Sequence, residues 1–350
     1  MENICIYPKI KKDNIYIQNF INTLDDFNVI EFSKIIKNPF LFFSIDIFHF
    51  NWYENFKTKK AIAQYFEFRF KVFLLLMIKI CKKKIIWTMH NKKTHSNKNK
   101  YSDRLVEILL EKSDRVLIHC SESLKYIDNL SKKEIEEKVV LIPHGNYIGC
   151  YQSKGINIRE KYNLGENEIV YMFIGKISRY KNIDLLIEGF LASEARENKL
   201  LIIGDGDKTY INELLNTYRF DNIIFDFHFV PDDEMVDYIS CADIFICPYD
   251  LESSLNSGSL IMYFSYGKTA ISPYIGTLKD IPENFFYSYT YINSSQHKKN
   301  LTECINQAHN QLSNDRNLFS KKGKEAYNFV NQNYDWNKLK IQINNLYKYI

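Results

Sequence analysis

The sequence predicts an α/β protein of two domains, each built on a parallel sheet with helices on both faces. The first observation is length, because 350 residues fit two such domains more comfortably than one. The second is that strand-like apolar runs alternate with helix-like segments along most of the chain, which is the pattern of parallel sheets. The third is the scarcity of Gly (12) and Pro (7), which argues against a turn-dense all-β protein.

Composition narrows the class of protein further. The chain is 45% hydrophobic and 15% aromatic, so a large core is expected and disorder is not. The net charge of +4 is mild and predicts no nucleic-acid partner. The 7 cysteines are scattered without a C-x-x-C pair, which favours reduced thiols in a cytoplasmic protein over disulfides or a zinc site. The start, MENICIYPKIKKDN, lacks the pattern of a signal peptide.

Residues 1–150 are expected to form the first domain. Strands are predicted over residues 3–7, 41–48, 84–89, 115–119 and 139–142, with helices over 15–26, 61–81, 103–112 and 122–130. Four histidines lie at the ends of these strands: His49, His90, His119 and His144. Ligands of parallel sheets bind beyond the carboxyl ends of the strands. A lone histidine is usually a satisfied core or surface group, but four in corresponding places favour a polar cleft.

The predicted helix over residues 61–81 has two interpretations. With Lys82, Lys83 and Lys84 after it, it resembles a basic, aromatic helix that lies on a membrane surface. The alternative is a core helix packed on the sheet, which is favoured because apolar residues surround most of it. Its longest apolar run, residues 72–78, is too short to cross a bilayer.

Residues 151–333 repeat the strand–helix pattern and are expected to form the second domain, followed by a final amphipathic helix over residues 334–350. Strands are predicted over 168–174, 199–203 and 223–227, and helices over 183–191, 210–218, 235–240, 300–312 and 316–333. Within this half, residues 241–276 read as strand, loop, helix and strand, with Gly267 ending the helix.

The start of that helix is the strongest candidate for binding. Ser257 or Ser259 would cap the helix, and Gly258 would let a ligand approach the backbone closely. Free N–H groups and the positive end of the helix dipole make this an anion site suited to a phosphate. An ordinary capped helix remains the alternative, since Ser and Gly are common at such positions.

A basic loop lies between the predicted strand that ends at Ile174 and the next helix. It carries Lys176, Arg179 and Lys181, which together could neutralise a diphosphate held at the nearby helix terminus. A solvated basic loop is the alternative.

Two other motifs favour structural interpretations. Gly204-Asp205-Gly206 is not a dinucleotide fingerprint, because the third glycine position of G-x-G-x-x-G holds Thr209. The acids Asp232, Asp233 and Glu234 precede a predicted helix, where they are expected to act as a cap and not as metal ligands.

Taken together, several segments resemble a known family. FIGKISRYKNIDLLIEGF, LLIIGDGD and SGSLIMYFSYGKTAISPYIGTLKDI are similar to the C-terminal half of GT-B glycosyltransferases of the family 4 type. FHFNW, IIWTMHN and LIPHG resemble the N-terminal half of its bacterial surface-polysaccharide members. The resemblance implies two Rossmann-like domains facing a central cleft, with the C-terminal helix crossing back to the N-terminal domain.

The same resemblance implies roles for particular residues. Lys176 and Lys181 would grip the diphosphate of a nucleotide-sugar donor, Gly175 would keep the loop close to it, and His90 would be the catalytic histidine near the sugar. No metal or other cofactor is implied. The remaining candidates are contacts to donor or acceptor, and they are Arg179, Glu252, Asn256 and His144.

One departure from the family pattern affects the prediction. Family 4 enzymes usually carry two glutamates eight positions apart around the phosphate helix, and these positions here hold Ser254 and Met262, with Glu252 out of step. The stretch Ser257-Gly258-Ser259 would then carry more of the phosphate binding. The donor and the stereochemistry of transfer are left open.

The expected function is transfer of a sugar from a nucleotide-diphosphate donor to a saccharide acceptor, by analogy a lipid-linked one in surface-polysaccharide synthesis. The expected location is cytoplasmic, with possible peripheral contact at the inner face of the cell membrane. The absent glutamates motivate one alternative, a catalytically inert nucleotide-sugar-binding protein. A nucleotide-sugar epimerase on the same scaffold is the other.

Overall fold

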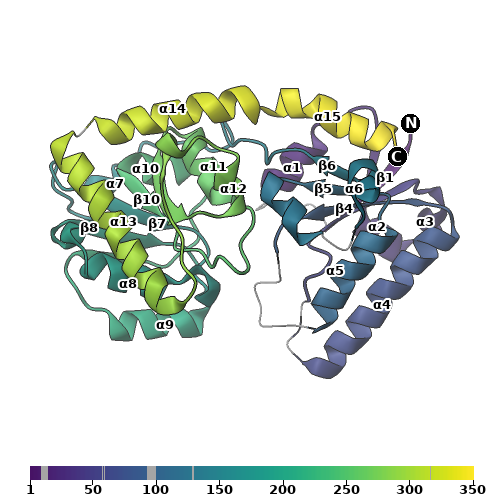
Figure 1. The fold of residues 1–350 in the computed structure, drawn as a ribbon, viewed down its shortest axis with the longest axis horizontal. Helices are drawn as coiled ribbons and strands as arrows, with labels where there is room; N and C mark the ends of the chain where they lie inside the picture. The colour runs from purple at the N-terminus through teal and green to yellow at the C-terminus, as the bar shows by residue number, and fades with distance from the viewer. Residues whose placement is uncertain (9–14, 57, 59, 93–99, 128–129, 316) are drawn as a thin grey trace. The chain divides into compact units, whose positions relative to one another are not determined.

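The chain divides into two compact α/β units (Figure 1). The computed structural model describes residues 1–350 except 9–14, 57, 59, 93–99, 128–129 and 316. The N-terminal unit comprises Met1–Gly145, Glu252–Asn256 and Tyr334–Ile350, and the C-terminal unit comprises Asn146–Leu251 and Ser257–Asn333. Each unit contains one parallel six-stranded sheet with helices packed on it, which confirms the predicted fold class.

The sheet of the N-terminal unit has the strand order β2-β1-β3-β4-β5-β6, and every pairing is parallel. The order reverses between β1 and β3, so this unit has its topological switch point there. The strands are β1 Asn3–Tyr7, β2 Asn28–Glu31, β3 Ile47–Asn51, β4 Lys84–Met89, β5 Arg115–Ile118 and β6 Val139–Leu141.

Helices cover both faces of this sheet. Alternate strand residues point to opposite faces, so each strand contributes apolar side chains to two cores. Phe48 and Ile85 belong to the core under one face, and Ile47 and Ile86 to the core under the other. The helices of the unit are α1 Ile15–Ile21, α2 Phe32–Lys37, α3 Leu41–Ser44, α4 Ala61–Ile80, α5 Lys100–Lys112, η1 Ser121–Tyr126, α6 Lys132–Lys138 and α15 Trp336–Lys348.

The C-terminal helix α15, yellow in Figure 1, packs in the N-terminal unit as predicted. Its Leu339, Ile343 and Tyr347 share a core cluster with Ile4 and Phe20. A carboxylate caps the helix, since Asp335 accepts hydrogen bonds from the backbone N–H groups of the first turn.

The strand predicted over residues 41–48 is wrong in its first half. Leu41–Ser44 forms the short helix α3, in which the N–H of Phe43 donates to the carbonyl of Phe40, and β3 begins only at Ile47. His49 therefore lies inside the strand and not after it. Helical backbone bonding after Pro39 overrides the β propensity of this aromatic run. The helix expected over residues 122–130 is also wrong, since only the 3₁₀ helix η1 forms there and 128–129 lie outside the described residues.

The sheet of the C-terminal unit has the order β12-β11-β10-β7-β8-β9, again with parallel pairings only. Counted from β7, this is the 3-2-1-4-5-6 order of doubly wound nucleotide-binding sheets, with the switch point between β7 and β10. The strands are β7 Val170–Ile174, β8 Lys199–Ile203, β9 Ile223–Asp226, β10 Ile244–Ile246, β11 Thr269–Pro273 and β12 Tyr287–Tyr289.

The helices of the C-terminal unit follow its strands in alternation. They are α7 Ile158–Lys161, η2 Arg179–Lys181, α8 Ile183–Leu191, η3 Glu194–Glu197, α9 Lys208–Thr217, α10 Met235–Cys241, α11 Gly258–Ser265, α12 Gly276–Lys279, η4 Glu283–Phe285, α13 Ser294–Asn314 and α14 Leu318–Asn333. Glu234 occupies the N-cap of α10, within the predicted acidic cap, but its side chain makes no cap hydrogen bond. Asp233 and Glu234 instead form ion pairs with Lys154.

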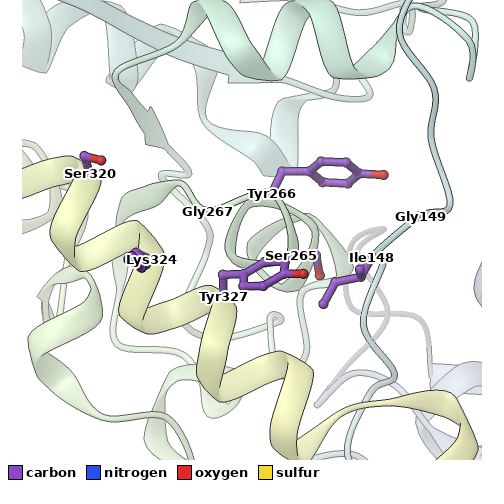
Figure 2. Close-up of a pocket in the computed structure, with 8 residues that line it drawn as sticks. All are labelled: Ile148, Gly149, Ser265, Tyr266, Gly267, Ser320, Lys324 and Tyr327. Carbon is purple, nitrogen blue, oxygen red and sulfur yellow. The ribbon is translucent and has the colours of Figure 1, made fainter.

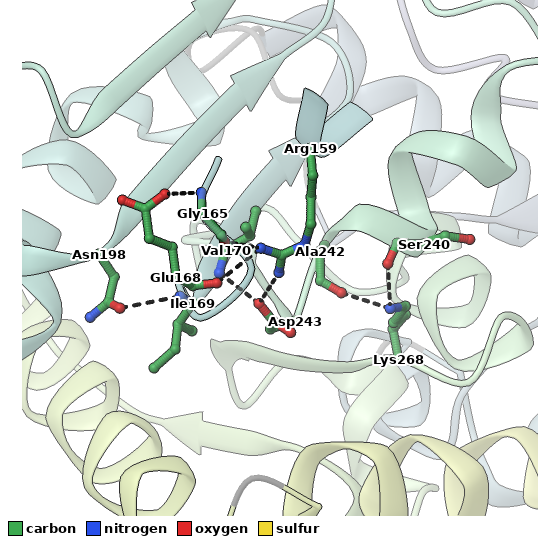
Figure 3. A network of polar contacts seen from close by, with 10 residues as sticks. All are labelled: Arg159, Gly165, Glu168, Ile169, Val170, Asn198, Ser240, Ala242, Asp243 and Lys268. Carbon is green, nitrogen blue, oxygen red and sulfur yellow. Dashed lines mark hydrogen bonds and ion pairs between the residues drawn. The ribbon is translucent and has the colours of Figure 1, made fainter. Parts of the chain in front are cut away.

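A polar network fastens the amino ends of three neighbouring strands (Figure 3). The Asp243 carboxylate, just before β10, accepts from the N–H of Val170 at the start of β7 (2.7 Å) and from Arg159 (3.1 Å). Lys268, just before β11, donates to the carbonyls of Ser240 (3.1 Å) and Ala242 (2.7 Å). The loops at the opposite, carboxyl ends of these strands are therefore left for ligands.

Candidate donor site and histidine cluster

The ring of Tyr249 connects the two predicted phosphate-binding elements of the C-terminal unit. Lys181, on the loop after β7, places its ammonium 4.1 Å from the ring centroid of Tyr249. The hydroxyl of Ser257, at the start of α11, donates to the phenol oxygen of Tyr249 at 2.9 Å. Because β7 and β10 flank the switch point, their loops meet where nucleotides bind in doubly wound sheets.

The basic loop is held in place by its last residue. Asn182 adopts a left-handed backbone conformation (φ 51°), and its side-chain amide donates to the carbonyl of Pro248 at 2.9 Å. This bond joins the loop after β7 to the loop after β10. It also places Lys181 directly before the first turn of α8.

The environment of Lys181 weakens its proton affinity. Burial lowers the pKa of this ammonium from 10.5 to about 8, because the charged form is desolvated. A half-buried lysine over an aromatic ring is poorly hydrated, so an incoming anion would meet a cation that has few competing partners.

The start of α11 provides free backbone donors beside this cation. Ser257 is the N-cap, since its hydroxyl accepts from the N–H of Leu260 (3.2 Å), as the sequence predicts for one of the two serines. The backbone N–H of Ser257 donates to the hydroxyl oxygen of Thr277 (2.8 Å). Within the described part of the chain, the N–H groups of Gly258 and Ser259 have no acceptor. These two amides are the donors that an anion would use.

Two glycines allow the loops after β7 and β8 to lie against each other. Gly204 has φ 140°, and a Cβ atom on it would lie 1.9 Å from the carbonyl oxygen of Gly175. A Cβ on Gly206 would lie 1.9 Å from the carbonyl oxygen of Ile177, with which Gly206 forms a β-bridge. The two glycines of Gly204-Asp205-Gly206 are therefore required for this close packing, which supports the Gly175 loop. Packing explains the G-D-G sequence, and no dinucleotide-binding role is needed.

The other basic residues of the loop are not drawn into this group. Lys176 is exposed, and one guanidinium nitrogen of Arg179, Nη2, donates to both carboxylate oxygens of the exposed Glu213 (2.6 and 2.5 Å). The sequence predicted that Lys176, Arg179 and Lys181 together bind a diphosphate. In the structure, Lys181 is the one of the three that lies against Tyr249. The sequence interpretation missed Tyr249 and Thr277, which carry no motif of their own.

In the N-terminal unit, His90 directly follows β4 and is held by Asn51. The Nε2 of His90 lies 2.9 Å from Oδ1 of Asn51, whose Nδ2 donates to the carbonyl of Tyr7. Since a carbonyl only accepts, the amide of Asn51 must point its oxygen at His90, and Nε2 carries the imidazole proton. Nδ1 is then the atom with a lone pair. The Trp52 ring stacks on His90 at 3.9 Å.

The other strand-end histidines surround Tyr16. His90, His119 and His144 have ring centroids 5.5, 5.4 and 4.7 Å from that of Tyr16. The Tyr16 hydroxyl donates to Nε2 of His119 (2.9 Å), because Nδ1 of His119 donates to the carbonyl of Ile142. His49 is fully buried and hydrogen-bonded to Thr88 and Tyr347, so it is part of the core and no longer a site candidate.

Burial and mutual repulsion keep this histidine cluster uncharged. Desolvation lowers the pKa of His49 and His119 to about 3 and that of His144 to about 4. The pKa of His90 lies well below 6.5, first through desolvation and then through the neighbouring histidines. At neutral pH these groups therefore act as hydrogen-bonding imidazoles and not as cations.

Two further candidates lie in the loop before α11, which belongs to the N-terminal unit. Asn256 donates from Nδ2 to the carbonyl of His90 at 2.9 Å. Its Oδ1 is buried and has no hydrogen-bond partner among the described residues, so it is an acceptor available to a ligand. Glu252 is exposed.

The C-terminal unit also has an open hollow of about 400 Å³ between α11 and α14 (Figure 2). It is lined by Ser265, Tyr266, Lys324 and Tyr327, among others, and by none of the predicted site residues. The described residues contain no group of three or more His, Cys, Asp or Glu side chains that could hold a metal ion. That the protein needs no cofactor remains a prediction.

Solved structures with this fold cover the whole chain. Sucrose-phosphate synthase from Thermosynechococcus elongatus superposes with a TM-score of 0.74 and 15% identity, over 99% of this chain and 98% of that one. The HepE protein of Anabaena, solved with UDP and glucose, gives a TM-score of 0.75 and 13% identity over 100% of both chains. The protein therefore has the GT-B fold of two-domain glycosyltransferases.

The sequence comparisons agree with this class. Residues 156–324 match the family described as "Glycosyl transferases group 1". The uncharacterized glycosyltransferase MJ1069 of Methanocaldococcus jannaschii is 25% identical over 306 residues, 83% of this chain and 74% of that protein. The alpha-monoglucosyldiacylglycerol synthase of Acholeplasma laidlawii is 25% identical over 131 residues, about a third of each chain (35% and 33%). The finer assignment to family 4 remains a prediction.

Proposed function

We propose that the protein transfers a sugar from a nucleotide-diphosphate donor to the hydroxyl of a saccharide acceptor. The observation that carries this proposal is the arrangement of Lys181, Tyr249 and the start of α11 at the switch point of the C-terminal sheet. A cation and two free amides at that place are the groups that a diphosphate requires.

The chemistry follows from where charge develops. When the bond between the sugar and the diphosphate breaks, negative charge grows on the departing phosphate oxygen. Lys181 and the amides of Gly258 and Ser259 would stabilise that charge, and their positions are fixed before the reaction by the Tyr249 and Asn182 contacts. Lys176, if it reaches the same phosphate, adds a second cation from the surface.

In the N-terminal unit, His90 would hydrogen-bond the transferred sugar or the acceptor through Nδ1. Its imidazole is neutral, so it accepts a proton or a hydrogen bond without repelling other groups. The unpaired Oδ1 of Asn256 and the ring of His144 would provide further contacts to donor or acceptor. His90 would be the catalytic residue in this scheme.

The acceptor we propose is a lipid-linked saccharide in surface-polysaccharide synthesis, and the location is the cytoplasm, peripherally at the inner face of the membrane. The partial similarity to a synthase named for a diacylglycerol glycolipid supports a lipid-bound acceptor. HepE, with the same fold, was solved with UDP-glucose, which supports a nucleotide-diphosphate sugar as donor.

The test is a donor-turnover assay with UDP-, GDP- and CMP-sugars, with and without saccharide acceptors. Lys181→Ala should lower turnover by about 100-fold or more, as removal of a transition-state charge stabiliser does. Lys298→Ala is the matched control, because Lys298 forms an exposed ion pair with Glu188 in the C-terminal unit. Equal turnover of the Lys181 variant and the wild type would contradict the assignment.

A second candidate, a nucleotide-sugar-binding protein without catalysis, is favoured by one observation. The two positions where glutamates are expected from the family pattern hold Ser254 and Met262, both of which are buried. Calorimetric binding of a nucleotide sugar, without nucleotide release in the presence of any acceptor, would favour this candidate. Interconversion of two nucleotide sugars without acceptor would instead indicate an epimerase.

A further inference from the structure

Helix α4 of the N-terminal unit exposes its apolar side. Five large apolar side chains spaced by about one or more helical turns point outward, with exposed fractions of 58–76%. A globular helix normally turns this side toward the core. The five are Ile62, Phe66, Phe70, Phe73 and Ile80.

The charged residue in the middle of α4 points the other way. Lys71 is 4% exposed, donates to the carbonyl of Asn55 (2.6 Å), pairs with Glu67 (2.9 Å) and lies over the ring of Phe56 (4.4 Å). Only Leu75 and Ile78 are buried with it. The core-packing interpretation of this helix is therefore wrong for its outer side, which no described residue covers.

The exposed apolar surface continues onto the neighbouring short helices. Lys83, just after α4, donates to the carbonyl of Phe43 in α3 at 2.7 Å, which places the end of α4 beside α3. Phe43 is 63% exposed, and Phe40 at the start of α3 is 82% exposed. We call the surface formed by Phe40, Phe43 and the five outward residues of α4 the α3–α4 face.

The charge along α4 and at its ends is mostly positive. Between Lys60 and Lys84 the chain carries seven cations and a single acid, Glu67, which is paired with Lys71. Two of the seven, Lys79 and Lys84, pair with Asp114. Lys60, Arg69 and Lys82 are exposed among the aromatic side chains or at the ends of the helix. Aromatic and aliphatic residues interspersed with cations fit an apolar layer beneath an anionic surface.

A second copy of the chain fits this face less well. A symmetric pair would place the two basic surfaces against each other, and the like charges would repel. Insertion across a bilayer does not fit either, since no helix in the described residues has both the length and the apolarity to span one. An anionic lipid surface matches both the apolar and the charged residues of this face.

We propose that the α3–α4 face docks the protein on the surface of an anionic lipid bilayer, with α4 lying in the plane of the headgroups. This inference deepens the peripheral membrane location and the lipid-linked acceptor of the proposed function, and its observations stand without the proposed reaction. Phe66, Phe70 and Phe73 enter the layer below the headgroups, while Lys60, Arg69 and Lys82 contact lipid phosphates.

The test is co-sedimentation of the full chain with vesicles of phosphatidylcholine alone and of phosphatidylcholine with phosphatidylglycerol. The wild type should bind the anionic vesicles only, and binding should fall at high salt. The variant F66S/F70S/F73S should bind about tenfold more weakly or worse. The matched control is L215S/F220S/F229S, which removes three exposed apolar side chains of the C-terminal unit (41%, 47% and 61% exposed) and should bind like the wild type.

Three results would overturn the proposal: no binding of the wild type to anionic vesicles, equal loss in both triple variants, or no loss in F66S/F70S/F73S. Sedimentation velocity without lipid tests for self-association. A wild-type dimer that becomes a monomer in F66S/F70S/F73S would assign the face to a second copy of the chain and not to lipid. Turnover with a soluble acceptor should be unchanged in F66S/F70S/F73S. Lys181→Ala should keep vesicle binding, so the docking proposal and the proposed reaction fail independently.

Discussion

The Oδ1 atom of Asn51, at the end of β3, accepts the Nε2 proton of His90, at the end of β4, over 2.9 Å. Asn51 is 1% exposed, and its amide is oriented by the carbonyl of Tyr7 across the switch point between β1 and β3. One buried amide therefore selects the tautomer of the proposed catalytic histidine. A change at Asn51 should alter the chemistry of His90 without touching a ligand.

The first prediction is that Asn51→Leu lowers kcat by about 10- to 100-fold, the effect of losing one buried orienting hydrogen bond. Asn51→Asp should instead raise the pKa of His90, since a carboxylate favours the imidazolium, and the pH–rate profile should gain an acidic limb. The measurement is kcat against pH. Asn344→Leu is the control, because Asn344 is a buried amide of the same unit that bonds the carbonyl of Thr23. An unchanged kcat in Asn51→Leu would contradict the role of Asn51 in orienting His90.

The second prediction concerns Lys181 and pH. Its pKa is about 8, so the cation is present at neutral pH and is lost as the pH rises through that value. Donor affinity should therefore fall above about pH 8, and bound diphosphate should raise the pKa. Lys181→Arg, which stays charged, should keep its affinity for UDP from pH 7 to 9.5. Titration calorimetry with UDP measures both, and a flat pH dependence in the wild type would contradict a role for this ammonium.

Much of the fold could be predicted from sequence because its signals are local. The apolar runs of β4, β7 and β8 are bounded by polar loops, and Gly267 ends α11 with φ 67°, as its position predicts. The N-cap was predicted as Ser257 or Ser259 for the same reason, and it is Ser257. Strand β2 and edge strand β12 were not predicted, since the pairing of each is set by distant neighbours.

The parts of the site that were missed depend on contacts between distant segments. Tyr249 is one of 25 tyrosines, and nothing in its local sequence indicates that it lies against Lys181. Leu255 lies in the loop before α11, yet it is buried in a core cluster of the N-terminal unit. The sequence left two interpretations of α4 open and favoured core packing, because apolar residues on all sides give no direction. The buried Lys71 shows which side faces outward.

The third prediction tests the close approach of the loops after β7 and β8. Gly204→Ala places a Cβ atom 1.9 Å from the carbonyl oxygen of Gly175 at φ 140°, so the loops must separate. We expect a loss of about 2–4 kcal/mol in the free energy of unfolding and weaker UDP binding. The control is Gly165→Ala, whose Cβ would meet its nearest neighbour at 3.4 Å. Urea unfolding and calorimetry are the measurements, and equal effects of both variants would contradict the packing argument.

The fourth prediction is that acid destabilises the N-terminal unit through its histidines. The pKa of His49 and His119 is about 3 in the folded state, below the ordinary value of 6.5. Between these values the unfolded chain binds more protons, so stability is full above about pH 7 and falls as the pH decreases toward the folded pKa. Each histidine contributes about 1.4 kcal/mol per pH unit below 6.5.

The chain offers a probe that reports this unit alone. Its 3 tryptophans, Trp52, Trp87 and Trp336, all lie in the N-terminal unit, so tryptophan fluorescence follows its unfolding in urea. Between pH 7.5 and 5.5 the urea midpoint should fall steeply in the wild type. His119→Phe loses the hydrogen bond from Tyr16 and is less stable at pH 7.5, but it has one fewer histidine to charge on unfolding. The free energy of unfolding of this variant should therefore change less steeply with pH, by the equivalent of about one proton. A slope equal to that of the wild type would show that His119 binds its proton as readily in the folded state as in the unfolded chain.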